Sequence, residues 1–154
     1  MTIEQTALKE KPAQEKPAKE KPVGALSPMK LAVTSAKTPQ FVKGRRDFFK
    51  YRDLGVTEGT NGFMRAQVTS AEKGMSKPTG WHVHKCQAQL VYVLSGWVDL
   101  EFADRKVRVK AGDSVMIPGN TPHNETGTSD TFELLEVSVP ADMGTEPCDP
   151  PPGH

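Results

Sequence analysis

Four histidines occur in this chain, and three of them, His82, His84 and His123, lie in its most strand-like region. His82 and His84 are separated by one residue, a spacing that points both imidazoles to the same face of a β-strand. Two half-polar rings on one face need partners for their nitrogens. A divalent transition metal is such a partner, because neutral imidazole binds Zn, Fe, Ni and Cu well. The pair alone leaves a metal site and a structural pair equally open.

The elements that must position these histidines are short runs with strand character, separated by Gly, Asn, Asp and Pro. Alternation is clearest over residues 106–110, where valines occupy one face and cations the other. Since the chain has no amphipathic stretch of helical length, the pattern predicts an all-β sandwich or barrel. The predicted strands cover residues 47–52, 63–70, 81–85, 90–94, 97–102, 106–109, 114–117 and 131–139.

Residues 1–40 and 141–154 differ in composition from the barrel expected over 41–140. Glu-Lys-Pro recurs at Glu10, Glu15 and Glu20, and prolines at this period prevent regular helical hydrogen bonding. The first segment is therefore predicted to be an extended, disordered tail that acts as a solvated spacer. A docking arm for an acidic partner is the alternative. The Pro-rich C-terminal segment is predicted to be irregular, laid against the barrel.

Charge and cysteine usage exclude several classes of partner. Beyond residue 40 the chain holds 13 Lys+Arg against 15 Asp+Glu, and this slightly acidic balance argues against nucleic acid. Neither an apolar run of about 18 residues nor the apolar core of a secretory signal occurs, so we expect no membrane partner. Only Cys86 and Cys148 are present, which favours a reducing cytoplasm but leaves one disulfide open.

The sequence around the histidines resembles the two motifs of the cupin superfamily, over roughly residues 60–140. The first cupin motif places a Glu and then a Gly after His-x-His. Here His82-Val83-His84 is followed by Gln89 and Gly96 at the same spacing. The second motif reads Gly, Pro-x-Gly, His and Asn. This chain has Gly112, Pro118 and His123 at the matching positions, but Asn120 stands in place of the second Gly and Gly127 in place of the Asn. The short segment between the motifs is similar to that of small single-domain bacterial cupins of the RmlC-like type.

This resemblance implies an all-β cupin jelly-roll barrel with one divalent transition metal ion per chain, either Fe, Zn, Ni, Cu or Mn. By position, the metal ligands are His82, His84 and His123. The usual acidic ligand is replaced by Gln89, which either ligates through its carbonyl or only lines the pocket. An uncharged donor set leaves about two positive charges on the site, which favours a small anionic ligand. Asn120 replaces a Gly, but Asn tolerates left-handed backbone, so the turn is expected to form.

Four nearby side chains have a functional and a structural interpretation. Cys86 either reaches the pocket as a reactive thiol or, as we favour, packs as a small apolar group. Glu125 either acts as a base or substitute ligand or, as we favour, is exposed in a loop. Tyr92 is favoured as a packing residue over a catalytic acid. Arg65 either clamps a carboxylate inside the barrel or is a solvated charge, and the sequence does not decide between them.

Three functions fit these features. The leading hypothesis is a small metal-dependent oxidoreductase of the dioxygenase type, since a three-histidine site leaves positions for O₂ and an anionic substrate. The second is a non-catalytic module that binds or senses a small anion. The third is an isomerase or lyase in which the metal polarises a carbonyl while Tyr92 or Glu125 moves a proton. Cupins are often homodimers, and the strand over residues 90–94, apolar on both faces, suits a position between sheets or at a subunit contact.

Overall fold

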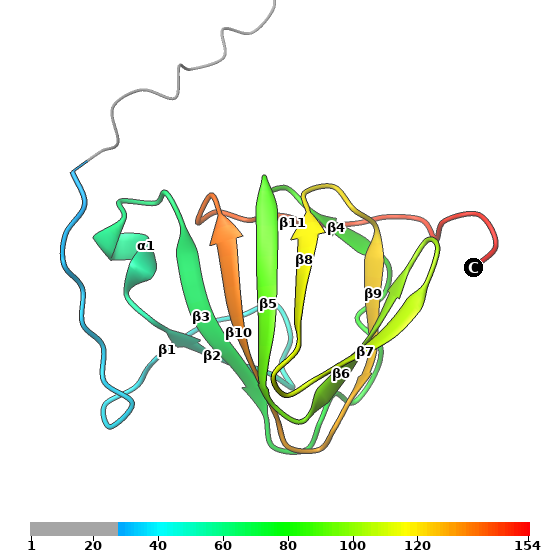
Figure 1. Cartoon of the computed structure of the whole chain (residues 1–154), viewed down its shortest axis with the longest axis horizontal. Helices are drawn as coiled ribbons and strands as arrows, with labels where there is room; N and C mark the ends of the chain where they lie inside the picture. The colour runs from blue at the N-terminus through cyan, green and yellow to red at the C-terminus, as the bar shows by residue number, and fades with distance from the viewer. Residues whose placement is uncertain (1–27) are drawn as a thin grey trace, which may run out of the picture.

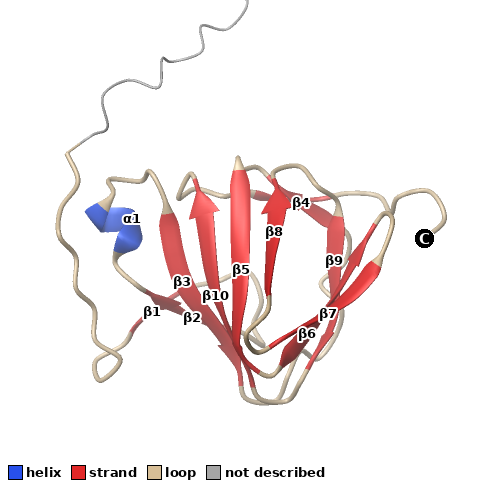
Figure 2. Ribbon diagram, in the orientation of Figure 1, coloured by secondary structure: helices blue, strands red, loops and turns tan. Residues whose placement is uncertain are grey.

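The computed structural model describes residues 28–154, so the repeats of the predicted tail lie outside the described residues. Two antiparallel sheets face each other and converge at one end, as Figures 1 and 2 show. The six-stranded sheet has the order β1 (Gln40–Val42), β2 (Lys50–Asp53), β3 (Arg65–Ala71), β10 (Phe132–Val139), β5 (Ala88–Ser95) and β8 (Ser114–Pro118). The five-stranded sheet has the order β11 (Thr145–Pro147), β4 (His82–His84), β9 (His123–Thr128), β6 (Trp97–Phe102) and β7 (Lys106–Lys110). The prediction of an all-β jelly-roll barrel is confirmed.

Three strands were not predicted. β9 occupies a stretch that we expected to be a loop, and β1 and β11 are only three residues each. β9 forms because β4 and β6 hydrogen-bond to its two edges, a long-range effect that overrides the weak strand propensity of its Gly and Asn. β11 lies in the C-terminal segment that we predicted to be irregular, and it pairs with β4 across from both motif-one histidines.

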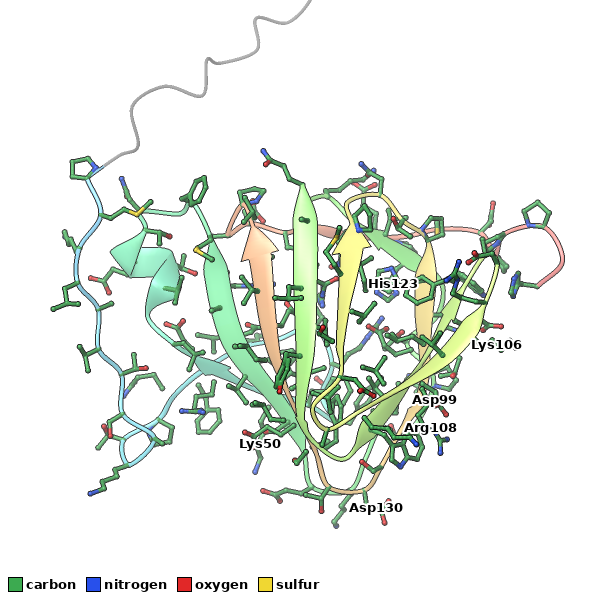
Figure 3. All side chains as sticks on the ribbon, in the orientation of Figure 1. Lys50, Asp99, Lys106, Arg108, His123 and Asp130 are labelled. Atoms are coloured by element: carbon green, nitrogen blue, oxygen red, sulfur yellow. The ribbon has the colours of Figure 1, made fainter. Side chains whose placement is uncertain are left out.

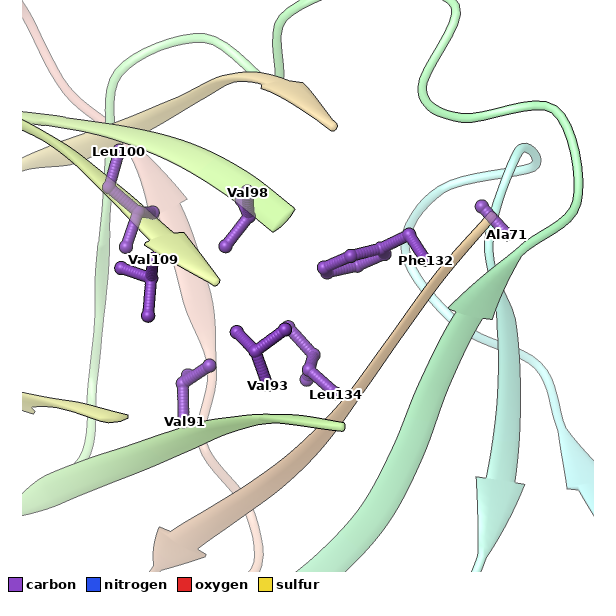
Figure 4. Close-up of a cluster of buried hydrophobic side chains, with 8 residues drawn as sticks. All are labelled: Ala71, Val91, Val93, Val98, Leu100, Val109, Phe132 and Leu134. Atoms are coloured by element: carbon purple, nitrogen blue, oxygen red, sulfur yellow. The ribbon is translucent and has the colours of Figure 1, made fainter. Parts of the chain in front are cut away.

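The apolar core fills the end of the barrel at which β10 begins. Inward residues of β5 and β10 are register partners there, with Val93 opposite Leu134. Val93 is fully buried, and Phe132 is only 2% exposed. The core cluster, drawn in Figure 4, consists of Ala71, Val91, Val93, Val98, Leu100, Val109, Phe132 and Leu134. This cluster closes one end of the barrel, and Thr69, the register partner of Leu134 on β3, is a buried polar residue beside it.

The inner face of the six-stranded sheet becomes polar toward the end of β10. Ser138 pairs in register with Arg65 of β3 on one side and with Gln89 of β5 on the other. Arg65 turns inward and its Nη2 donates to Glu136 Oε1 at 2.8 Å. Gln67 Nε2 donates to the same oxygen at 3.3 Å. The carboxylate that Arg65 clamps is therefore one of the protein's own, which decides the alternative left open by the sequence.

The outer face of β5 is apolar and is not covered within residues 28–154. Leu90, Tyr92 and Leu94 are 42%, 41% and 43% exposed, and Met116, the register partner of Leu90 on β8, is 60% exposed. The helix α1 (Val56–Gly59) lies near β3 instead. The expectation that both sides of this strand are covered by sheets is therefore wrong, which leaves a subunit contact as the remaining prediction.

Among the described residues, no helix is long and apolar enough to cross a membrane. Cys86 and Cys148 are both free thiols, so the one disulfide that the sequence left open does not form.

Candidate metal centre

Pairing between β4 and β9 brings the three histidines together. His82 is the register partner of His123, and His84 lies on the same face of β4 as His82. All three side chains are buried, and each offers a nitrogen within 4.8 Å of the others. His123 begins β9 and can be located by its label in Figure 3. The three histidines selected from the sequence are thus one cluster.

Hydrogen bonds at Nδ1, the ring nitrogen that faces away from the cluster, orient the imidazoles of His82 and His123. His82 Nδ1 lies 2.7 Å from the Gly80 carbonyl oxygen, and His123 Nδ1 lies 2.8 Å from that of Thr121. Because a carbonyl only accepts, both Nδ1 atoms carry the proton and both Nε2 atoms present a lone pair. Among residues 28–154, the buried Nε2 atoms of His84 and His123 have no hydrogen-bond partner. Unpartnered, inward-facing lone pairs of this kind suit a divalent transition metal.

His84 is oriented by residues from both ends of the described chain. Its Nδ1 lies 3.0 Å from Thr145 Oγ1 on β11 and 3.1 Å from Arg45 Nη1. Arg45 Nη1 donates to Thr145 Oγ1, so the threonine hydroxyl lies between the two side chains. Burial and the Arg45 charge lower the pKa of His84 to about 3. The imidazole is therefore neutral at pH 7, the form in which histidine ligates metals.

The turn before β9 rests on the loop after β4, which couples the two cupin-like motifs. Asn120 N donates to the His84 carbonyl at 2.9 Å, and Gly119 N donates to that of Gln87 at 3.1 Å. Asn120 has a φ of 61°, so the expected left-handed turn forms with Asn in place of Gly. A side chain at Gly119 would overlap the Cys86 carbonyl oxygen. The need for glycine at this position is steric and was not recognised from the sequence.

Glu125 lies inside the site rather than in an exposed loop, so our favoured interpretation of this residue is wrong. Its Oε2 is 3.7 Å from His82 Nε2, and its side chain is 22% exposed. Burial alone would raise the pKa of Glu125, but the positive charge that His82 and His123 carry when protonated brings it below its usual range. The strand period explains this placement, because residues two apart on β9 share a face. The alternative that we ranked lower is the one that the geometry supports.

The other candidate residues lie farther from the three histidines or serve other contacts. Gln89 is buried on the opposite sheet, and within the described chain its Oε1 has no hydrogen-bond partner. Burial and the nearby Glu136 raise the pKa of the Cys86 thiol, which favours the inert thiol over a thiolate. Tyr92 points to the outer face of β5 and does not reach the barrel interior.

A cavity of about 50 Å³ lies beside His82 and Glu125. Arg45 and Arg46 supply positive charge to its wall, and burial raises the pKa of Tyr51, which stays a neutral phenol. The remaining described lining residues are Phe49, Thr69, Thr79, Val98, Phe132, Leu134, Glu136 and Thr145. A small molecule in this cavity would contact both apolar, partly aromatic side chains and two guanidinium groups.

Comparison with known protein families gives one match. Residues 68–139 match the family described as "Cupin domain", and this range includes all three histidines, Gln89 and Glu125. No curated protein matches the sequence of this chain.

Solved structures of the same fold share little sequence with this chain. The polyketide cyclase RemF from Streptomyces resistomycificus is 20% identical, with a TM-score of 0.61 over 75% of this chain and 84% of that one. An RmlC-like cupin from Shewanella frigidimarina is 19% identical, with a TM-score of 0.59 over 75% and 96% of the two chains. The iron(II) form of HppE is 16% identical, with a TM-score of 0.56 over 71% and 60%. At these identities the likeness extends to the fold alone.

Proposed function

Since the chain belongs to the cupin family, we propose that it is a metal-dependent enzyme of the dioxygenase type that acts on a small anionic molecule inside the barrel. The observation that carries this proposal is the convergence of three buried imidazoles beside a cavity. His82, His84 and His123 would hold the ion through their Nε2 atoms. When bound, the metal would supply Lewis acidity and, if it is iron, a site for O₂.

Residues that line the cavity would bind the substrate, exclude water and donate a hydrogen bond. Arg45 and Arg46 would bind the negative charge of the substrate at the cavity wall. Phe49, Phe132 and Leu134 would exclude water, which strengthens these charge interactions. Tyr51 would donate a hydrogen bond to the substrate, because its raised pKa keeps the phenol protonated.

A lyase or isomerase is the second candidate, and Glu125 is the observation that favours it. If Glu125 does not bind the metal, its ionised carboxylate lies at the cavity wall, where Oε2 could take a proton from a substrate. Tyr92 has no part in this candidate, because it lies on the outer face. The polyketide cyclase among the structural neighbours shares the fold alone with this chain.

Metal identity and oxygen dependence separate these functions. We expect protein reloaded with iron(II) to consume O₂ when mixed with members of a panel of small carboxylates and thiols, and to lose this activity under nitrogen. Turnover under nitrogen by the Zn- or Mn-loaded protein would refute the dioxygenase function and support the lyase or isomerase function. Tight Zn or Ni binding with no turnover in either atmosphere would indicate the non-catalytic binding module.

We propose that the exposed face formed by Leu90, Tyr92, Leu94 and Met116 pairs with the same face of a second chain. The side chains of these four residues carry no charge, so two copies can meet in a symmetric contact without repulsion. We expect light scattering to give twice the chain mass for the wild type and the single chain mass for Leu90→Lys. Leu31→Lys, at a position that is 95% exposed and outside this face, is the matched control. A monomeric wild type would refute the contact.

A further inference from the structure

We infer that Glu125 is the acidic ligand of the metal centre, supplied by β9 in place of the carboxylate that Gln89 lacks. This inference rests on the proposed metal site and names a further ligand for it. Glu125 and His123 lie two residues apart on one strand, and His82 is the partner of His123 on the neighbouring strand. All four donors therefore come from the β4–β9 pair.

The distance between Glu125 and His82 is close to that of two ligands on one ion. Zn–N and Zn–O bonds are about 2.0 to 2.2 Å, so two such donors at angles of roughly 90° to 110° lie about 3.0 to 3.5 Å apart. Oε2 is 3.7 Å from His82 Nε2, the nitrogen that faces the site. Glu125 is not in the group of three histidines whose nitrogens all lie within 4.8 Å of one another, so its side chain would turn toward His84 and His123 when the ion binds.

Thr79 holds this carboxylate in place. The Thr79 hydroxyl donates to Glu125 Oε2 and accepts from the Glu125 backbone N at 3.0 Å. Thr79 N in turn donates to the Glu125 carbonyl at 3.0 Å, and Arg46 Nη2 donates to the Thr79 carbonyl at 2.7 Å. Carboxylates that ligate metals are themselves held by hydrogen bonds in this way. An exposed glutamate would not need such a scaffold.

The positive charge around the site also supports Glu125 as the acidic metal ligand. A divalent ion on three neutral imidazoles would lie near Arg45, whose guanidinium is 3.1 Å from His84 Nδ1. Of the described residues that line the cavity, only Glu125 and Glu136 are acidic, and Glu136 is already paired with Arg65. Glu125 is therefore the carboxylate available to offset the charge of the ion. Gln89, on the opposite sheet, is left to line the pocket with its unpartnered Oε1.

The test is metal binding by the full chain carrying Glu125→Gln, a substitution that keeps the shape and removes the charge. We expect the affinity for Zn to fall by about 100-fold, the upper end of the loss seen when outer-shell support is removed, because here a ligand itself is lost. We also expect the visible spectrum of the Co²⁺-loaded protein to change, since its bands report the donor set. Glu133→Gln, at a partly exposed site on β10, is the matched control and should alter neither property.

Two other outcomes have distinct meanings. Wild-type Zn affinity together with an unchanged Co²⁺ spectrum in Glu125→Gln would overturn the inference and return Glu125 to the role of a free base. A wild-type protein that binds neither metal would instead refute the proposed metal site. Thermal melting of the apo variant checks that a lost affinity does not come from a lost fold.

Discussion

His84→Ala should bind no metal while keeping the barrel folded. The wild-type chain, expressed without a histidine tag, should carry about one equivalent of a divalent transition metal. Removing His84 deletes a buried donor whose Nε2 has no other partner within the described chain. Two imidazoles and one carboxylate would remain, and the loss of one of the four proposed donors should weaken binding enough for the variant to be purified without metal. The apolar core lies at the other end of the barrel and should hold the fold.

Mass spectrometric metal analysis measures this effect, and circular dichroism verifies the fold. His154→Ala is the matched control, because His154 contacts Glu101 and the Ala103 carbonyl rather than the cluster. It should keep its equivalent of metal. Unchanged metal content in His84→Ala would remove His84 from the ligand set, and consistently metal-free wild type would refute the site.

The three histidines could be predicted as one site because their positions depend on short-range features, namely the two-residue period of a strand and the geometry of one turn. A spacing of two residues puts His82 and His84 on one face of any strand, and the turn at Asn120 needs only a residue that tolerates a positive φ. The short segment between the two motifs then predicts a barrel in which His123 lies beside His82 and His84. Each of these steps depends on a few consecutive residues or on the family spacing, and each is confirmed by the fold.

The groups that support the histidines could not be predicted, because they come from distant segments. Arg45 and Thr145 reach His84 from 39 and 61 residues away. Glu125 lies within β9, whose Asn, Thr and Gly residues resemble a loop, and only the pairing of β9 with β4 and β6 shows which way the side chain points. Contacts of this kind depend on tertiary pairing, which overrides local propensity.

The turn over residues 118–120 determines how the two halves of the site meet. It hydrogen-bonds to the loop that follows His84 and leads directly into the strand that begins with His123. The Cys86 carbonyl fills the space that a side chain at Gly119 would need. Even a methyl group there must push the two backbones apart, because neither partner is a flexible side chain.

Gly119→Ala should therefore weaken both the fold and metal binding. We expect a loss of about 3 kcal/mol of stability, the upper end for overpacking a filled site. For a domain of this size that corresponds to a decrease of about 10 °C in Tm, measured by calorimetry on the apo protein. Zn affinity should fall by at least about 10-fold, because the displaced turn separates His84 from His123.

Asn120→Gly is the matched control for this turn. Its φ of 61° suits glycine, and its backbone N–H to the His84 carbonyl is kept, so Tm should change by only a few degrees and Zn affinity should stay close to wild type. If Gly119→Ala melts and binds Zn like the wild type, then the contact with Cys86 does not hold the two motifs in register. A loss of affinity without a loss of stability would show that the turn positions the histidines but contributes little to folding.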